Sequence, residues 1–266
     1  MDRPAAVAGM FYPGDAKDLR AEVERLIGPA PSEEHAIAVV APHAGYAYSG
    51  AVAGAVYREV RVPTAAIVLC PNHTGDGARA AIMSSGSWHI PGRSVPVDKR
   101  LAEELRDAAG LTEDRLAHAR EHSLEVQLPF LMYRNPSVRL VPVCLAQLPF
   151  ESCARIGNAL ADVVSRHGRD LLLVASTDMS HYLSADAARE KDQLAMDRIA
   201  ALDPEGLYST VLERDISMCG FIATVVVLVA SKALGATTAR LVRYANSGDV
   251  SGDTAHVVGY AGFVIR

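Results

Sequence analysis

The chain has 266 residues, of which 50% are hydrophobic and 21% are charged, a composition that can bury a core and excludes a disordered chain. Its formal net charge of −5 at pH 7 argues against a nucleic-acid partner, because non-specific nucleic-acid binding needs a basic surface. An α/β chain of this length usually folds as one unit, so we expect a single domain over residues 1–266.

The cysteines and the apolar segments indicate the cellular compartment. The four cysteines have no paired spacing, which predicts free thiols in a reducing compartment. Asp2 and Arg3 precede only a short apolar stretch, which predicts no signal peptide. The longest uncharged segment, 216–231, is shorter than the roughly 20 residues that span a bilayer, so we expect a buried helix there. We therefore expect a cytoplasmic protein with no membrane partner.

Short apolar runs alternate with amphipathic stretches along the chain. Asp15 can cap a helix that buries Leu19, Val23 and Ile27 and ends at Gly28. The elements that follow are a strand at 36–41, a strand at 67–70, a helix from Asp98 to Gly110, a strand at 140–145, a helix from Ile156 to Gly168, a strand at 171–175, a polar helix that begins at Ser184, and strands at 239–244 and 256–265. This alternation predicts an α/β layered fold with a mostly parallel sheet.

Histidines follow three of the predicted buried strands. His43 and His73 each come within two residues of a strand-ending proline, and His181 lies shortly after the strand at 171–175. Because the carboxyl ends of parallel strands meet at one edge of a sheet, these imidazoles could converge although the chain separates them widely. Each histidine taken alone could equally be a loop residue that is hydrogen-bonded to backbone.

Converging neutral imidazoles suit a divalent transition metal, and a carboxylate or a thiolate could complete the ligand set. The candidates for this extra ligand are Asp178, Glu125 and Cys219. Cys219 stands just before the apolar helix, whose positive end would favour a thiolate. The other three cysteines lie in apolar patterns and are expected to be buried and inert: Cys70, Cys144 and Cys153.

A second polar cluster, Glu121-His122-Ser123-Leu124-Glu125, precedes another apolar run. Helical spacing would place His122 and Glu125 on adjacent turns of one face. A solvated helix start capped by Ser123 is an equal alternative for this segment. Four other histidines lie in polar or turn contexts and are expected at the surface: His35, His89, His118 and His167.

Six short motifs are specific enough to indicate a family, and they cover essentially the whole chain: Ala8-Gly9-Met10-Phe11-Tyr12-Pro13, Ala41-Pro42-His43-Ala44-Gly45-Tyr46, Glu121-His122-Ser123-Leu124-Glu125, Ser176-Thr177-Asp178-Met179-Ser180-His181, Met218-Cys219-Gly220 and Tyr244-Ala245-Asn246-Ser247-Gly248-Asp249. In this order they resemble the Memo family, labelled in prokaryotes AmmeMemoRadiSam system protein B. The resemblance implies the three-layer α/β/α fold of class III extradiol ring-cleaving dioxygenases, with a central mixed, mostly parallel sheet. The prokaryotic label also implies association with radical-SAM and AMMECR-type proteins.

The same resemblance implies roles for particular residues. His43 and His73 match the two histidines with which those dioxygenases hold iron(II), and Cys219 matches the third position, where the enzymes have glutamate. His181 matches their acid/base histidine, and His122 matches a histidine that contacts substrate or dioxygen. The cysteine departs from the enzyme pattern and also makes copper or zinc a candidate metal.

Three functions are consistent with these residues. The first is a metal-binding protein similar to non-haem iron extradiol dioxygenases, a redox enzyme for an unknown small substrate, in which Asp178 could hold the His181 ring and raise its basicity. The second is a metal-dependent hydrolase in which Asp178 or Glu125 acts as base. The third is a non-catalytic module that binds a peptide or a partner protein in the same cleft.

Overall fold

The structure, a computed structural model, describes residues 2–167 and 171–266. Within these ranges a nine-stranded mixed sheet runs through the molecule in the order β10-β11-β1-β8-β2-β7-β3-β6, and β9 pairs with β11. The strands of this sheet are β1 (Ala38–Ala41), β2 (Ala65–Pro71), β3 (Ala80–Ile82), β6 (Thr112–Glu113), β7 (Arg139–Leu145), β8 (Leu171–Ser176), β9 (His181–Leu183), β10 (Ala239–Asn246) and β11 (Val257–Ile265).

The four strands at the centre of the sheet, β1, β8, β2 and β7, are parallel to one another. Every residue of β1, β2 and β8 is buried, as expected for strands that helices cover on both faces. Ala175 of β8 is in register with Val40 of β1 on one side and with Leu69 of β2 on the other. The three strands therefore end at the same level, and the segments that follow them leave one edge of the sheet together.

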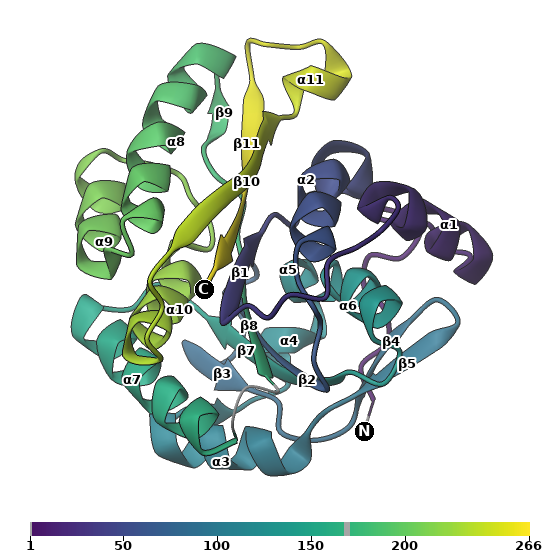
Figure 1. The fold of residues 1–266 in the computed structure, drawn as a ribbon, viewed down its shortest axis with the longest axis vertical. Coiled ribbons are helices and arrows are strands. Elements are labelled where there is room, and N and C mark those ends of the chain that lie inside the picture. The colour runs from purple at the N-terminus through teal and green to yellow at the C-terminus, as the bar shows by residue number, and fades with distance from the viewer. Residues whose placement is uncertain (1, 168–170) are drawn as a thin grey trace.

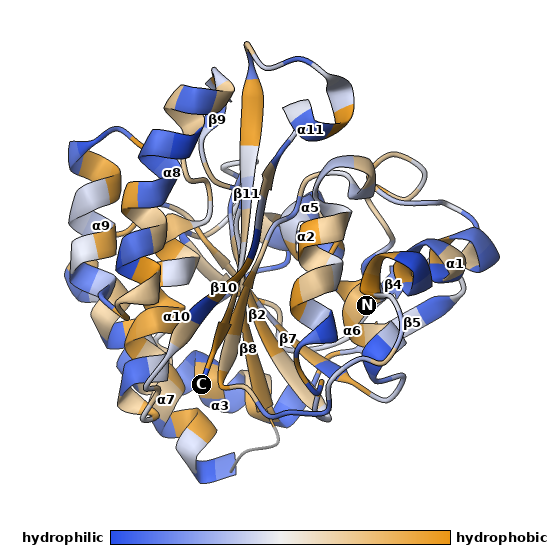
Figure 2. Ribbon diagram, turned by 45° about the horizontal axis from the view of Figure 1, so that its top comes forward, coloured by the Kyte–Doolittle hydropathy of each residue, from blue (hydrophilic) through white to orange (hydrophobic). Residues whose placement is uncertain are grey.

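Helices form a layer on each face of the sheet (Figure 1). One layer consists of α1 (Ala16–Ile27), α2 (Tyr46–Arg58), α5 (His122–Glu125) and α6 (Leu128–Arg134). The opposite layer consists of α3 (Lys99–Ala109), α7 (Phe150–His167), α8 (Ala185–Ala200), α9 (Pro204–Glu213) and α10 (Phe221–Ala233). Short elements complete the fold: α4 (Leu116–Ala119), α11 (Gly248–Ser251) and a hairpin of β4 (Ser87–Ile90) and β5 (Arg93–Pro96). Figure 2 shows the central strands as the most hydrophobic part of the fold. The three-layer α/β/α fold class expected from the sequence is confirmed.

Helix ends follow the signals that the sequence carries. The carboxylates of Asp15 and Asp98 cap α1 and α3, and the Ser184 hydroxyl caps α8, each accepting a backbone N–H of the first turn. Gly28 and Gly110 end α1 and α3 with φ angles of 73° and 63°, which strain any residue that has a Cβ atom. The predicted end of α7 at Gly168 lies outside the described residues.

The apolar helix begins later than the sequence pattern indicates. Residues 216–220 form an irregular segment before α10 starts at Phe221. Gly220 lies so close to the end of β8 that an added Cβ atom would be 2.3 Å from the Ser176 carbonyl oxygen. Its N–H donates to the Thr177 hydroxyl at 2.9 Å. These contacts hold the segment against the sheet edge where the histidines emerge. No helix in the described ranges is both long and apolar enough to cross a membrane.

Candidate metal centre

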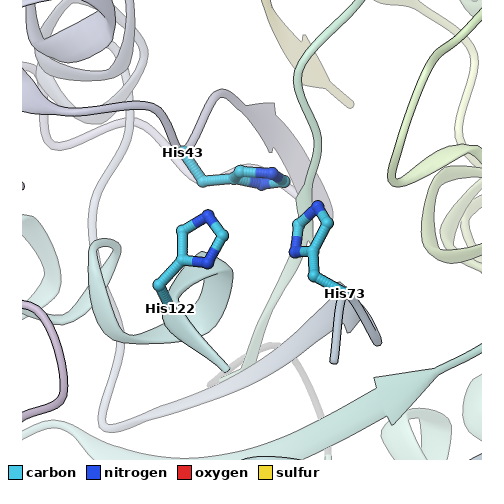
Figure 3. A group of neighbouring side chains, drawn as sticks. All are labelled: His43, His73 and His122. Atoms are coloured by element: carbon cyan, nitrogen blue, oxygen red, sulfur yellow. The ribbon is translucent and has the colours of Figure 1, made fainter. Parts of the chain in front are cut away.

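Three histidines from distant parts of the chain meet at the carboxyl edge of the central strands (Figure 3). His43 follows β1, His73 follows β2, and His122 is the first residue of α5. One potential ligand atom of each lies within 4.8 Å of those of the other two. Nitrogens that share one ion through bonds of about 2.1 Å lie at most about 4.2 Å apart, so only a small approach is needed.

The protonation of His43 follows from its neighbours. The Ser176 hydroxyl donates its single hydrogen to the Ser123 carbonyl oxygen at 2.6 Å and accepts a hydrogen from the Gln127 amide at 2.8 Å. It must therefore also accept from His43, whose Nδ1 lies 3.0 Å away. With the proton on Nδ1, the Nε2 lone pair of His43 is free to bind a metal.

His73 is fixed by a buried carboxylate. Glu121 accepts the backbone N–H of His73 at 2.7 Å, and its other oxygen lies 2.9 Å from Nδ1. Burial alone would raise the pKa of Glu121, but hydrogen bonds from His73 and Ser123 outweigh it and hold this pKa at about 2. The ionised carboxylate can only accept, so His73 carries its proton on Nδ1 and presents Nε2. Carboxylate–histidine pairs of this kind orient metal ligands in many proteins.

His122 closes the third side of the group. Its ring stacks on that of His73 with centroids 4.8 Å apart, and Phe11 packs on it at 4.7 Å. Burial lowers the pKa of His122, and burial together with the neighbouring imidazoles lowers the pKa of His43 well below its usual range. Both rings are therefore neutral near pH 7, the form that binds metals.

Cys219 lies beside the group, against His43. Its Sγ is 3.2 Å from His43 Nε2 and accepts the backbone N–H of Asp178 at 3.3 Å. Burial, and secondly the nearby Asp178, raise the pKa of this thiol above its ordinary value. The expectation that Cys219 is a thiolate is therefore wrong, because desolvation outweighs the hydrogen bonds from Asp178 and Thr177 that oppose it.

Asp178 contacts His43 rather than His181. Its Oδ1 accepts the backbone N–H of His43 at 2.7 Å, and its Oδ2 lies 3.9 Å from His43 Nε2. Burial raises the pKa of Asp178 to about 7 although backbone N–H groups of His43 and Ala44 oppose the shift. The carboxyl is thus poised to change its proton near neutral pH.

His181 lies outside the three-histidine group. Its backbone N–H donates to the Ser217 hydroxyl at 2.8 Å, and its Nδ1 lies 2.9 Å from the Ser217 carbonyl oxygen. A carbonyl can only accept, so His181 carries its proton on Nδ1, and Nε2 of the neutral ring is unprotonated. The expectation that Asp178 holds this ring is wrong. The Ser217 carbonyl holds it instead, because the segment before α10 packs against His181 while Asp178 faces His43.

Glu125 anchors the N-terminal segment. Its buried carboxylate pairs with Arg3 at 2.5 Å and accepts the Tyr12 hydroxyl and the backbone N–H groups of Ala6 and Val7. Both oxygens are therefore fully used in holding residues 3–12 against α5. Arg3 also donates to backbone oxygens of α4 and of the residue before α5.

Sequence reasoning left the supporting residues of the site without a role. Glu121 and Ser176 belong to two of the family motifs, but their role depends on contacts with the Nδ1 atoms of His73 and His43, which are distant in the chain. An acidic residue next to a site histidine was the available signal for Glu121. The surface expectation for His118 is wrong: the ring is buried against Trp88, and its Nδ1 bonds the Asp114 carbonyl oxygen.

The chain is similar to known proteins over most or all of its length. A family model described as Memo-like protein matches residues 3–264. A MEMO1 family protein of Methanopyrus kandleri is 43% identical over 281 residues, which span 100% of this chain and 99% of the relative. A MEMO1 family protein of Methanothermobacter thermautotrophicus is 40% identical, with 98% of this chain and 99% of the relative covered. Uncharacterized protein JW3007 from Escherichia coli K12, a solved structure, matches with a TM-score of 0.51 at 15% identity, covering 84% of this chain and 98% of that one, a likeness that shows the fold alone.

Proposed function

The chain belongs to the Memo family, and from this premise we propose that it is a metal-dependent oxidoreductase, similar to non-haem iron extradiol dioxygenases, that acts on a small substrate. The observation that carries the proposal is the group of three imidazoles, two of which have their Nδ1 protons committed to Ser176 and Glu121. Such preset tautomers present lone pairs at one point. The donor set fits a divalent transition metal.

In this proposal His43, His73 and His122 hold the metal, and Cys219 is a further donor next to His43. Iron(II) is the first candidate for the metal. If Cys219 binds as a thiolate, the affinity of the site for copper or zinc would rise relative to iron(II). The ion would supply open coordination positions and redox chemistry. Because the thiol of Cys219 has a raised pKa, its participation would require loss of a proton on metal binding.

The residues around the group have distinct tasks in the proposed reaction. Glu121 and Ser176 keep the two rings in one orientation, so little reorganisation is needed on binding. His181 presents an unprotonated Nε2 and can take a proton from a substrate hydroxyl and return it to the product. Asp178, with a pKa of about 7, can buffer that proton next to His43.

A hydrolase is the second candidate, and one observation favours it. A carboxyl whose pKa is about 7 could act as general base toward water, and Asp178 is such a group. In that case zinc would be the natural metal. Glu125 is a weaker choice for this base, because its oxygens are occupied by Arg3, Tyr12 and backbone N–H groups.

Oxygen uptake by defined metal forms tests the proposal. The chain is loaded under nitrogen with iron(II), copper or zinc and then assayed for oxygen consumption with catechols and for cleavage of activated esters. We expect the iron form of the wild type to consume oxygen with at least one catechol, and the same form of His73→Ala to be inactive. A zinc form that cleaves esters while no form takes up oxygen would replace the proposal by the hydrolase. Peptide binding in the absence of both activities would favour the non-catalytic module.

Association with radical-SAM and AMMECR-type proteins belongs to the same proposal. A redox protein could serve such partners by modifying a shared small molecule. Mixing the purified proteins and measuring complex formation by size-exclusion chromatography tests this part on its own. Co-elution is expected, and separate elution at micromolar concentrations would contradict it.

A further inference from the structure

A cavity of about 440 Å³ lies away from the histidine group, between α1, α6 and the turn that joins β4 to β5. Figures 1 and 2 both show these elements side by side, on the face of the sheet that α1 and α2 cover. None of the three histidines, and neither Asp178 nor Cys219, lines this cavity. Its volume is within the range of small-molecule sites, about 300–1,000 Å³.

The inner wall of the cavity is formed by apolar side chains. Leu19 and Val23 face it from one side of α1, Met132 faces it from α6, and Ile90 faces it from the end of β4. These four side chains are buried against their neighbours, which fixes the position of the inner wall. Prolines make up much of the remaining lining and stiffen it: Pro31, Pro91, Pro129 and Pro136.

The charged residues that line the cavity are all positive. Three arginines line it, Arg20, Arg93 and Arg134, and no acidic residue does. Within the described part of the chain, neither Arg20 nor Arg93 forms an ion pair, and both are exposed. In a chain of formal net charge −5, an apolar cavity with unpaired guanidinium groups at its rim is complementary to an anion.

Arg134 adds a buried donor. Its side chain is 5% exposed, donates to the Ser32 and Val60 carbonyl oxygens and pairs with Glu33 at 3.1 Å. Its Nε is buried and has no hydrogen-bond partner among the described residues. Protein groups therefore hold Arg134 in place, and its role at the cavity is its positive charge.

We propose that this cavity binds a small amphipathic anion, that is, an acyl or aromatic body with one carboxylate or sulfonate group. The body would fill the space between α1 and α6, where its apolar surface is removed from water. The anionic group would lie at the rim and accept charge-assisted hydrogen bonds from Arg20 and Arg93. This site is independent of the metal and of the proposed oxidoreductase function.

Fluorescence titration with 1-anilinonaphthalene-8-sulfonate tests the proposal on the metal-free protein. We expect saturable binding of one probe per chain, weakened at least about tenfold in Arg20→Glu/Arg93→Glu, since both charge-assisted hydrogen bonds to the sulfonate are lost and two like charges replace them. Arg20→Lys/Arg93→Lys should keep most of the affinity. Lys99→Glu/Arg100→Glu is the control, because it makes the same charge change at exposed positions of α3 outside the cavity.

Competitors define the ligand chemistry. Dodecanoate and 2-naphthoate should displace the probe, and the stronger competitor shows whether the cavity prefers an acyl or an aromatic body. Dodecanol, 2-naphthol and inorganic phosphate should not displace the probe at equal concentration. The proposal is overturned if the probe does not bind saturably, if the rim variant and the control bind equally, or if the alcohols compete as well as the anions. Matching thermal midpoints of the variants show that the fold is kept.

Discussion

His181 is the residue whose substitution best separates metal binding from proton transfer. Its Nδ1 faces the Ser217 carbonyl oxygen, and it lies outside the three-histidine group. We predict that His181→Ala keeps its metal while oxygen-dependent turnover falls by about 10²–10⁴-fold, the usual contribution of a general acid or base. Metal analysis and oxygen uptake on the same preparation check this. Loss of metal in the variant would instead make His181 a ligand.

Cys219 sets the predicted metal preference. A thiolate donor favours copper and zinc, whereas a carboxylate favours iron(II), so Cys219→Glu should shift selectivity toward iron(II). Competition between the metals under nitrogen measures the shift, with His122→Ala as the comparison. Equal preferences in wild type and Cys219→Glu, combined with weakened binding in His122→Ala, would make His122 the third ligand and leave Cys219 outside the set.

His118 makes stability depend on pH. Burial lowers the pKa of this ring from about 6.5 to about 4, and its side chain is fully buried. The unfolded chain therefore takes up the proton first as pH falls, and the stability present above pH 6.5 is lost between pH 6.5 and 4, by ~3 kcal/mol for such a shift. Urea unfolding from pH 7.5 to 4.5 should show a steeper loss in wild type than in His118→Asn. Parallel curves for the two proteins would contradict this origin of the pH dependence.

At the scale of elements, α5 links the metal group to the sheet through its capping residue. Glu121 precedes α5, accepts the Ser123 N–H there and holds the His73 ring with the same carboxylate. We predict that Glu121→Gln weakens metal affinity by about 10–100-fold, the usual effect of losing a carboxylate behind a metal-binding histidine. Calorimetric metal titration measures the change, and Glu59→Gln on the surface serves as the matched control. Unchanged affinity would show that Glu121 only caps the helix.

The N-terminal segment is joined to α5 by a buried ion pair. Arg3 is 4% exposed and Glu125 is fully buried, so removing either partner leaves an uncompensated charge. Glu125→Gln and Arg3→Met should each destabilise the fold by about 3–5 kcal/mol in urea unfolding. The pair Glu59 and Arg240, exposed on the surface, gives the comparison, and its Arg240→Met variant should cost about 1 kcal/mol or less. Equal costs at both pairs would contradict a structural role for Glu125.

For the molecule as a whole, local signals predicted the elements better than the contacts. The helices that start after Asp15, Asp98 and Ser184 and the buried strands lie where the sequence predicts them, because each depends on neighbours within a few residues. The helix α2 and the hairpin of β4 and β5 were not predicted. The small apolar residues of α2, from Tyr46 to Arg58, are buried on most sides and give no amphipathic pattern.

The candidate site shows the same limit at long range. The convergence of His43 and His73 follows from the parallel strands that precede them, which the sequence already indicates. The third member, His122, and the partners of Asp178, Glu125 and His181 depend on how segments far apart in the chain pack together. The buried position of His118 was missed for the same reason, since a polar helix turn carries no sign of the Trp88 and Arg3 side chains that cover it.

The metal content of the protein tests the central claim most directly. Wild type, His73→Ala and His89→Ala are purified under nitrogen, supplied with equal iron(II), copper and zinc, and analysed for bound metal after removal of the excess. His89 is the matched control, because it lies outside the three-histidine group and pairs with Asp2 at a partly exposed position. We predict about one ion per chain in wild type and in His89→Ala, and at most about a tenth of an ion per chain in His73→Ala, because a ligand is lost. Wild type that retains no metal, or a His73→Ala variant that binds as much as His89→Ala, would contradict a metal centre built on these histidines.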